Sequence, residues 1–295
     1  MTVSPQRSAR EVLTRAMTTA ATELESFEGG IRVNAFDALH QARTRVRRLR
    51  SMLSVYSQVF GGSERRAMRA RLSQLGVRLG TARDDEVRVA ALRERLESAD
   101  DATAPALRRL VIDAESRAAR SRADVLATLD SAAHRALLAD LRTFVGRASV
   151  GPGADGPITA LARHALRRGA RAVGRDAKSA ASSGSLEDLH ELRKAARRVR
   201  YAAEAVQADV PGASELAVAA EAVQDALGDH RDAMLLADEL RSWSRRAHGG
   251  SAGPMVELAD TIERDAGARL SDLGELVAAV RRASAGVGRA QGPRP

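Results

Sequence analysis

The sequence predicts an all-α fold. Alanine, leucine, arginine and glutamate dominate the 295 residues, and these residue types favour helices. Apolar residues recur at the three- and four-residue spacing of a helix along almost the whole chain. Runs of β-branched residues are short, and no segment predicts a strand. The chain is long enough for one large or two modest domains with real cores.

Clusters of glycine, proline and serine divide the chain into about ten helices of ordinary length. The predicted breaks lie at residues 28–30, 61–63, 151–157, 182–185, 211–212 and 249–251, and at Gly80, Pro105 and Gly228. The richness of residues from about 284 onward in Ala, Gly, Pro and Arg predicts a disordered tail, placed at residues 286–295.

Two motifs occur twice, in the same order and at nearly the same spacing. His-x-x-Arg-x-x-x-Arg-Arg-apolar-Arg begins at His40 and again at His190, and Leu-Gly-x-x-Arg-Asp occupies residues 79–84 and 227–232. The repetition predicts an internal duplication into halves at residues 8–150 and 157–285, joined by the Gly/Pro-rich segment 151–157. We expect two helical bundles related by a pseudo-twofold axis.

Each His-Arg motif forms a cationic face when it is placed on a helical wheel. The polar face of the first copy contains His40, Arg43, Arg47 and Arg50, and Arg48 flanks it. The polar face of the second contains His190, Arg193, Arg197 and Arg200, flanked by Arg198 and widened by Lys194. The opposite faces predict core positions: Ala42, Val46, Leu49 and Leu53 in the first copy, and Leu192, Ala196 and Val199 in the second.

Successive arginines on such a face lie about 4.5–6 Å apart along the helix axis, so they could follow a linear chain of phosphates. The alternative is a solvent-exposed basic face balanced by acids on neighbouring helices. The first copy has no Asp or Glu at the adjacent turns of this face, and the face is built twice. Both observations favour a polyanionic ligand.

A third basic face occurs only in the second half. It contains His164, Arg167, Arg168, Arg171, Arg175 and Lys178, opposite Ala162, Leu166 and Val173. The corresponding helix of the first half, with Arg10 and Arg15, is far less basic. We therefore expect the second half to bind the anion more strongly, with Arg168, Arg171 and Arg175 taking part.

The Leu-Gly-x-x-Arg-Asp motifs predict helix ends. Gly80 and Gly228 would stop one helix, after which Thr81 and Asp229 would cap the next. Asp84 and Asp232, three residues further on, resemble the acids of a capping box. Arg83 and Arg231 would then lie at helix starts, where they either join the anion site or pair with a carboxylate.

Composition limits the range of functions. The chain has no cysteine, a formal net charge of +9 and one Trp, two Tyr and four Phe. Disulfide and thiolate–metal sites are excluded, and there is little material for base stacking. Neither a signal peptide nor a membrane-spanning run is evident. We expect a cytoplasmic protein with no membrane partner, and with no sequence-specific recognition of nucleic acid.

At this point the paired motifs are seen to resemble the CHAD family (conserved histidine α-helical domain) over about residues 8–285. The resemblance implies two pseudo-symmetric bundles with a basic groove or pore, and binding of inorganic polyphosphate rather than catalysis. It assigns contacts to His40, Arg43, Arg47, Arg48 and Arg50, and to His190, Arg193, Lys194, Arg197, Arg198, Arg200 and Tyr201. Thr44 and Ser51 replace Lys194 and Tyr201 in the first copy. Many relatives add a triphosphate-processing domain, and we expect a stand-alone module here.

The expected function is therefore non-catalytic polyphosphate binding without a cofactor or metal, with an association with polyphosphate granules as a consequence. A metal-dependent hydrolase of polyphosphate or phosphate is the competing enzymatic function. No metallohydrolase or nucleophile motif is evident, and each motif histidine precedes an arginine at i+3 that would repel a divalent cation. Non-specific binding of nucleic acid through phosphates and docking of an acidic protein also stay open. We expect the Arg197→Ala/Arg200→Ala variant to weaken polyphosphate binding more than any pair of changes outside the cationic faces.

Overall fold

The computed structural model describes residues 7–147, 151, 153–246 and 252–289. The ten elements of this part of the chain are all α-helices, which confirms the all-α prediction. They are α1 (Ala9–Arg32), α2 (Ala38–Val55), α3 (Gly62–Glu97), α4 (Ala104–Asp130), α5 (Ala132–Arg147), α6 (Ile158–Ser183), α7 (Leu186–Glu204), α8 (Ala213–Arg246), α9 (Ala252–Ala268) and α10 (Leu273–Gly286).

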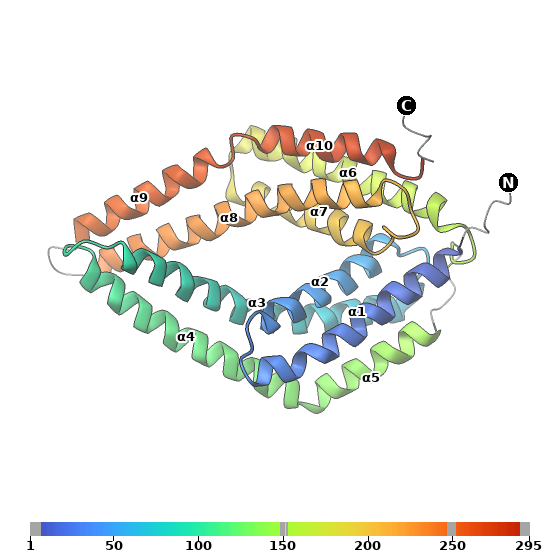
Figure 1. The fold of residues 1–295 in the computed structure, drawn as a ribbon, viewed down its shortest axis with the longest axis horizontal. Helices are drawn as coiled ribbons and strands as arrows, with labels where there is room; N and C mark the ends of the chain where they lie inside the picture. The colour runs from blue at the N-terminus through green and yellow to red at the C-terminus, as the bar shows by residue number, and fades with distance from the viewer. Residues whose placement is uncertain (1–6, 148–150, 152, 247–251, 290–295) are drawn as a thin grey trace.

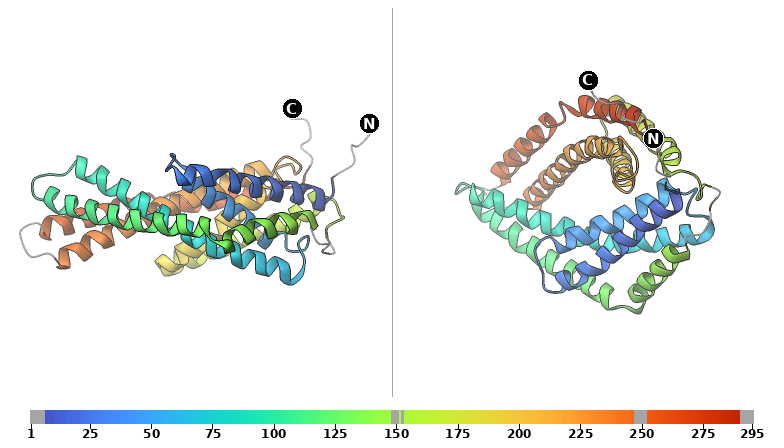
Figure 2. Two further views of the ribbon diagram at one scale, coloured as in Figure 1. Left: turned by 90° about the horizontal axis from the view of Figure 1, so that it is seen from below. Right: turned by 45° about the vertical axis from the view of Figure 1, so that its right-hand side comes forward.

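Helices α1 to α5 form the lower part of the molecule in Figure 1, and α6 to α10 form the upper part. The edge-on view in the left panel of Figure 2 shows that the helices lie within one elongated slab. Each half begins with a helix of similar length, and its third helix is the longest, with 36 residues in α3 and 34 in α8. Such a pattern is what a duplication predicts, and the duplication itself stays a prediction.

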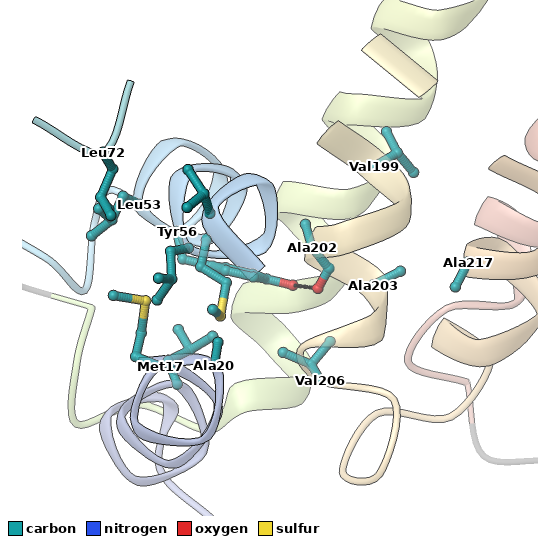
Figure 3. Packing of buried hydrophobic residues seen from close by; sticks show 14 of the residues in the cluster. Met17, Ala20, Leu53, Tyr56, Leu72, Val199, Ala202, Ala203, Val206 and Ala217 are labelled. Carbon is teal, nitrogen blue, oxygen red and sulfur yellow. Dashed lines mark hydrogen bonds between the residues drawn. The ribbon is translucent and has the colours of Figure 1, made fainter. Parts of the chain in front are cut away.

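The two halves share their hydrophobic cores. The larger core joins side chains of α1, α2, α3 and α5 to side chains of α6, α7 and α8, and the smaller joins the far ends of α3 and α4 to α8 and α9. Figure 3 shows the larger core where α2 meets α7: the buried Tyr56 hydroxyl donates a hydrogen bond of 2.7 Å to the Ala202 carbonyl oxygen. The α2–α7 contact is therefore held by both apolar packing and a buried hydrogen bond.

Several predicted breaks are confirmed. Pro105 lies in the first turn of α4. The capping box that Ser8 closes with Glu11 at the start of α1 was not predicted. Gly184 ends α6 in the left-handed conformation that favours glycine, with φ of 63°. In the connecting segment a Cβ on Gly151 would lie 1.8 Å from the Gln58 carbonyl oxygen, so this position requires glycine. Residues 249–251 lie outside the described part of the chain.

Three predicted features were wrong. Gly80 and Gly228 do not end helices, because α3 and α8 continue through them, and Thr81 and Asp229 therefore cap nothing. A glycine costs a helix only about 1 kcal/mol relative to alanine, which the packing of buried neighbours such as Leu79 and Leu227 exceeds. Residues 28–30 likewise lie inside α1.

The predicted tail at residues 286–295 begins too early. Val287 is completely buried, and the Gly288 N–H donates a 2.9 Å hydrogen bond to the Pro211 carbonyl oxygen. The burial of Val287 and this hydrogen bond fix the chain beyond the end of α10. Composition alone does not reveal either contact. Residues 290–295 lie outside the described part of the chain.

Candidate anion-binding site

The two His-Arg motifs lie on α2 and α7, which pack against each other between the halves. Their predicted apolar faces are confirmed: Val46 and Leu49 of α2 and Leu192 of α7 are fully buried. Burial of these faces turns the cationic faces of both helices toward a common region. Sequence positions 150 residues apart thus contribute to one site.

Four arginines of this region have no carboxylate partner. Arg47 and Arg50 of α2, with Arg193 and Arg197 of α7, make no ion pair within 4.0 Å to any described residue. All four are partly buried, and the Nε atoms of Arg50 and Arg193 are buried without a hydrogen-bond partner. We call these four residues the arginine cluster. Unsatisfied donors and uncompensated charge of this kind are unusual in a protein interior.

The charges of the cluster repel one another. Burial, followed by repulsion from Arg47 and Arg193, lowers the pKa of Arg197 to about 9. Burial and repulsion from Arg47 also lower the pKa of Arg193. Arg50 has a lowered pKa as well, because of burial and repulsion from Arg69 and Arg47. Guanidinium groups remain protonated at neutral pH, so the ligand-free site concentrates positive charge from both halves.

Carboxylates flank the cluster at both ends. Asp84 of α3 lies 3.0 Å from Arg43 of α2 and 3.9 Å from Arg231 of α8, measured between the carboxylate oxygens and the guanidinium nitrogens. Glu204, the last residue of α7, pairs with Arg48 of α2 at 2.7 Å and with Arg200 of α7 at 2.8 Å. Each of these two acids therefore holds arginines from both halves and leaves the cluster between them unpaired.

The Leu-Gly-x-x-Arg-Asp motifs provide the surfaces on which two arginines lie. A Cβ on Gly80 would lie 3.7 Å from the Nε atom of Arg43, and a Cβ on Gly228 would lie 3.2 Å from the Nη2 atom of Arg193. The motif aspartate follows its glycine by one helical turn and so occupies the same face. Asp84 pairs with Arg43 in this way. Asp232 attracts Arg193 but makes no ion pair with it within 4.0 Å, and pairs instead with Arg231 at 3.4 Å.

Both motif histidines border the cationic region. Burial, with repulsion from Arg83, Arg43 and Arg47, lowers the pKa of His40 against the attraction of Asp37. Burial and repulsion from Lys194 and Arg231 lower the pKa of His190. Both imidazoles are therefore mostly neutral at pH 7 in the ligand-free protein. An anion bound beside them would favour their protonated forms.

A pocket of about 280 Å³ opens beside the second histidine. His190, Arg193, His230 and Arg231 contribute to its lining. In the part of the chain that the structure covers, no three His, Asp or Glu side chains gather as metal ligands. The described helices also include none that is long and apolar enough to cross a membrane.

Comparison with known protein families identifies the chain. The model of the CHAD domain matches residues 15–241. The chain belongs to the CHAD domain family. Two Mycobacterium tuberculosis proteins, Uncharacterized protein MT2285 (strain CDC 1551 / Oshkosh) and Uncharacterized protein Rv2226 (strain ATCC 25618 / H37Rv), are each 32% identical to this CHAD domain over 235 residues. The alignment covers 77% of this chain and 44% of theirs, so the chain spans less than half of their length.

Solved structures show the same fold. The CHAD domain from the plant Ricinus communis has a TM-score of 0.70 at 22% identity, over 97% of this chain and 94% of that one. PptA from Streptomyces chartreusis has a TM-score of 0.71 at 18% identity, over 92% of this chain and 99% of that one. The arrangement of helices that brings α2 and α7 together is therefore shared with other proteins.

The structure divides the predicted site residues of this CHAD domain into groups. Those in or beside the arginine cluster are His40, Arg43, Arg47, Arg50, His190, Arg193, Arg197 and Arg231. Two members of this group, Arg43 and Arg231, also pair with Asp84. The other predicted residues that carboxylates hold are Arg48 with Glu204, Arg83 with Glu86, Lys194 with Glu191, and Arg200 with Glu204 and Glu221. The ion pairs of Arg200 make it a weaker candidate than Arg47 for contact with an anion.

The remaining predicted residues lie elsewhere. Arg168, Arg175 and Arg198 line a separate pocket of about 260 Å³ between α6 and α7. Arg171 and Arg175 line a groove between α6 and α10. Tyr201 is only 2% exposed, and its ring lies 5.3 Å from the Cζ atom of Arg200, so it supports that side chain from below the surface.

Sequence reasoning missed the acids that flank the site. Glu204 lies four residues after Arg200, a spacing that signals an ion pair within one helix. Its second contact, with Arg48, depends on how α2 packs against α7. Asp84 was assigned to helix capping, which concealed its contacts with Arg43 and Arg231.

Proposed function

We propose that this CHAD domain binds inorganic polyphosphate at the arginine cluster between α2 and α7, and that it does so without hydrolysing the ligand. The observation that carries the proposal is the set of four partly buried guanidinium groups without carboxylate partners among the described residues. Leaving buried charges uncompensated costs stability. A bound polyanion would supply the missing charge and accept the unsatisfied donors.

The dimensions of the site favour a chain of phosphates over a single small anion. Arg43 and Arg50 are separated by seven residues of α2, or about 10 Å along the axis. Arg193 and Arg197 form a second row on α7. The arginines of the two rows repel one another, which indicates that the rows lie close together. A flexible chain with a negative charge on every unit can contact cations on both sides along this length.

Nucleic acid is a weaker candidate. The arginines are partly buried between two helices, where a flexible chain reaches them more easily than the phosphates of a stiff duplex. The seven aromatic residues offer little for the stacking of bases (one Trp, two Tyr and four Phe). We expect excess polyphosphate to displace DNA readily, and excess DNA to displace polyphosphate poorly.

Binding should be measured by calorimetry with phosphate polymers of defined length. We expect the Arg47→Ala/Arg197→Ala variant to lose at least about ten-fold in affinity, because both groups are unpaired and belong to the cluster. The matched control is Arg108→Ala/Arg109→Ala, which removes the same charge from two exposed positions of α4. An equal loss in both variants would show only a general electrostatic effect and would count against the site.

The absence of hydrolysis is tested separately. Polyphosphate incubated with the protein and Mg²⁺ or Mn²⁺ should retain its chain length on a gel. If the protein shortens the polymer and the Arg47→Ala/Arg197→Ala variant does not, the protein is a hydrolase and the proposal of binding without hydrolysis is wrong. Tight binding would also bring the protein to cytoplasmic polyphosphate granules, and a fluorescent fusion of the same variant should lose that location.

A further inference from the structure

A second surface of the molecule combines an apolar floor with a cationic edge. A groove of about 880 Å³ runs between α6 and α10, where α6 contributes residues from Ala170 to Ala181 and α10 contributes residues up to Ser284. Its floor includes Leu189, Leu270, Leu273 and Val277, which are all only partly buried. The groove shares no lining residue with the arginine cluster.

The walls of the groove are fixed. The Arg167 side chain of α6 donates hydrogen bonds to the Ser284 and Ala285 carbonyl oxygens of α10, at 3.1 Å and 2.8 Å. Leu276 of α10 also packs against the larger core. The groove is therefore a permanent feature of the fold between two anchored helices.

All charged residues that line the groove are cationic. They are Arg171, Arg175 and Lys178 of α6 and Arg281 of α10. All four are exposed, and none makes an ion pair within 4.0 Å with a described residue. The three residues of α6 are spaced by four and three positions, so they form a row about 10 Å long at the edge of the groove.

Small residues on α6 leave room for another backbone. Ala170, Gly174, Ala177 and Ala181 line the groove at helical spacing and span about 16 Å, or three turns. On α10, Gly274 and Ala278 do the same. A Cβ added to Gly174 or Gly274 would meet nothing within 4 Å. A helix could therefore pack closely against both walls.

We propose that the α6–α10 groove binds an amphipathic helix of a partner protein, with the apolar face of that helix on the floor and acidic residues along the Arg171–Arg175–Lys178 row. Charge selects the occupant: the uniformly cationic lining disfavours a basic helix, and the apolar floor disfavours a purely polar acidic segment. Three turns of helix match the length of the α6 wall. This proposal is independent of polyphosphate binding.

The test uses the full chain and a fluorescein-labelled synthetic helical peptide of about four turns, with leucine and alanine on one face and glutamates at i, i+4 and i+7 beside it. A scrambled peptide of identical composition keeps the charge and removes the amphipathic pattern. At an ionic strength of about 0.15 M we expect the patterned peptide to bind at least about ten-fold more tightly than the scrambled peptide. Equal binding of the two peptides would overturn the proposal.

Gly174→Leu and Gly274→Leu fill the groove from its two walls, and we expect either change to weaken peptide binding by about ten-fold or more. Gly146→Leu is the matched control, because Gly146 is an exposed helical glycine of α5 with equally open surroundings. Circular dichroism checks that each variant folds. Peptide binding that survives both groove-filling changes would exclude the groove as its site.

Two further measurements separate the candidate ligands. The Gly174→Leu variant should bind polyphosphate as the unchanged protein does, and Arg47→Ala/Arg197→Ala should bind the peptide normally, so either proposal can fail alone. Vesicles of phosphatidylglycerol test a membrane surface as the occupant. If the protein binds vesicles but not the patterned peptide, and Gly174→Leu abolishes vesicle binding, the groove binds lipid and the proposal of a partner helix is wrong.

Discussion

Arg197 shows at the scale of one residue how the proposed function conflicts with stability. Its apolar neighbours on α7 are buried, and its guanidinium group has no carboxylate within 4.0 Å among the described residues. Repulsion from three arginines adds to the effect of burial on its pKa. The uncompensated charge destabilises the fold, and binding of the proposed anion would relieve this cost.

Replacing Arg197 with methionine should therefore raise stability and weaken binding. Methionine keeps an unbranched side chain of similar length and removes the buried charge. Replacement of buried ions by apolar residues stabilises some proteins by about 1–4 kcal/mol, and each 1 kcal/mol raises Tm by about 1–2 °C in a chain of 295 residues. Calorimetric melting measures the gain. A lower Tm together with unchanged polyphosphate affinity would contradict the account.

His40 and His190 should make binding depend on pH. The pKa of each lies below the usual value of 6.5, and the proposed polyanion would raise it on binding. Binding therefore takes up protons, and affinity should rise as the pH falls from above the bound-state pKa to below the free-state pKa. Each unit of pKa rise corresponds to about a ten-fold gain in affinity.

The pH effect is measured by calorimetry in buffers of different ionisation enthalpy, which report the number of protons taken up. The variant His40→Gln/His190→Gln should bind without that uptake, because it lacks the two histidines whose lowered pKa values would rise on binding. Proton release in the unchanged protein, or uptake that persists in the variant, would assign the titration to other groups.

The wheel positions of the arginines could be predicted from the sequence, but their partners could not. Val46, Leu49 and Leu192 set which faces of α2 and α7 point inward, because apolar spacing is a local property. Whether an arginine meets a carboxylate depends on the register between helices. Glu204 reaches Arg48 only because the C-terminal ends of α2 and α7 lie together.

At the scale of elements, α3 and α8 show why the glycines were misinterpreted. Glycine ends many helices, and Thr81 and Asp229 after Gly80 and Gly228 resemble caps. In the structure each glycine instead lies beneath an arginine of the preceding helix. The signal that separates the two interpretations is the aspartate one turn later, which shares a face with its glycine.

Gly228→Ala and Gly80→Ala should differ in their effect on binding. Alanine raises helix stability by about 1 kcal/mol relative to glycine at such a position. At residue 228 the new Cβ lies 3.2 Å from Arg193, which must move, whereas at residue 80 it makes an ordinary contact of 3.7 Å with Arg43. Polyphosphate affinity should fall in Gly228→Ala alone, while neither variant loses thermal stability. Equal affinities would show that the position of Arg193 is unimportant.

At the scale of the whole molecule, the two halves act as one body. They share both cores, and Asp84 and Glu204 pair with arginines from both halves. At the far end, Glu239 of α8 pairs with Arg88 of α3 and with Arg117 of α4. The shared cores depend on long-range packing, which the motif repeats do not specify.

The central claim is that arginines of both halves contact one anion, and a double-mutant cycle tests it most directly. Polyphosphate binding is measured for Arg47→Ala, Arg197→Ala and the double variant, with Arg47→Ala/Arg108→Ala as the reference cycle. The account predicts that removing the second arginine of the cluster reduces the binding free energy less once the first is gone, with a coupling energy of about 1 kcal/mol or more. Losses that add within about 0.5 kcal/mol, as in the reference cycle, would mean that α2 and α7 serve separate sites.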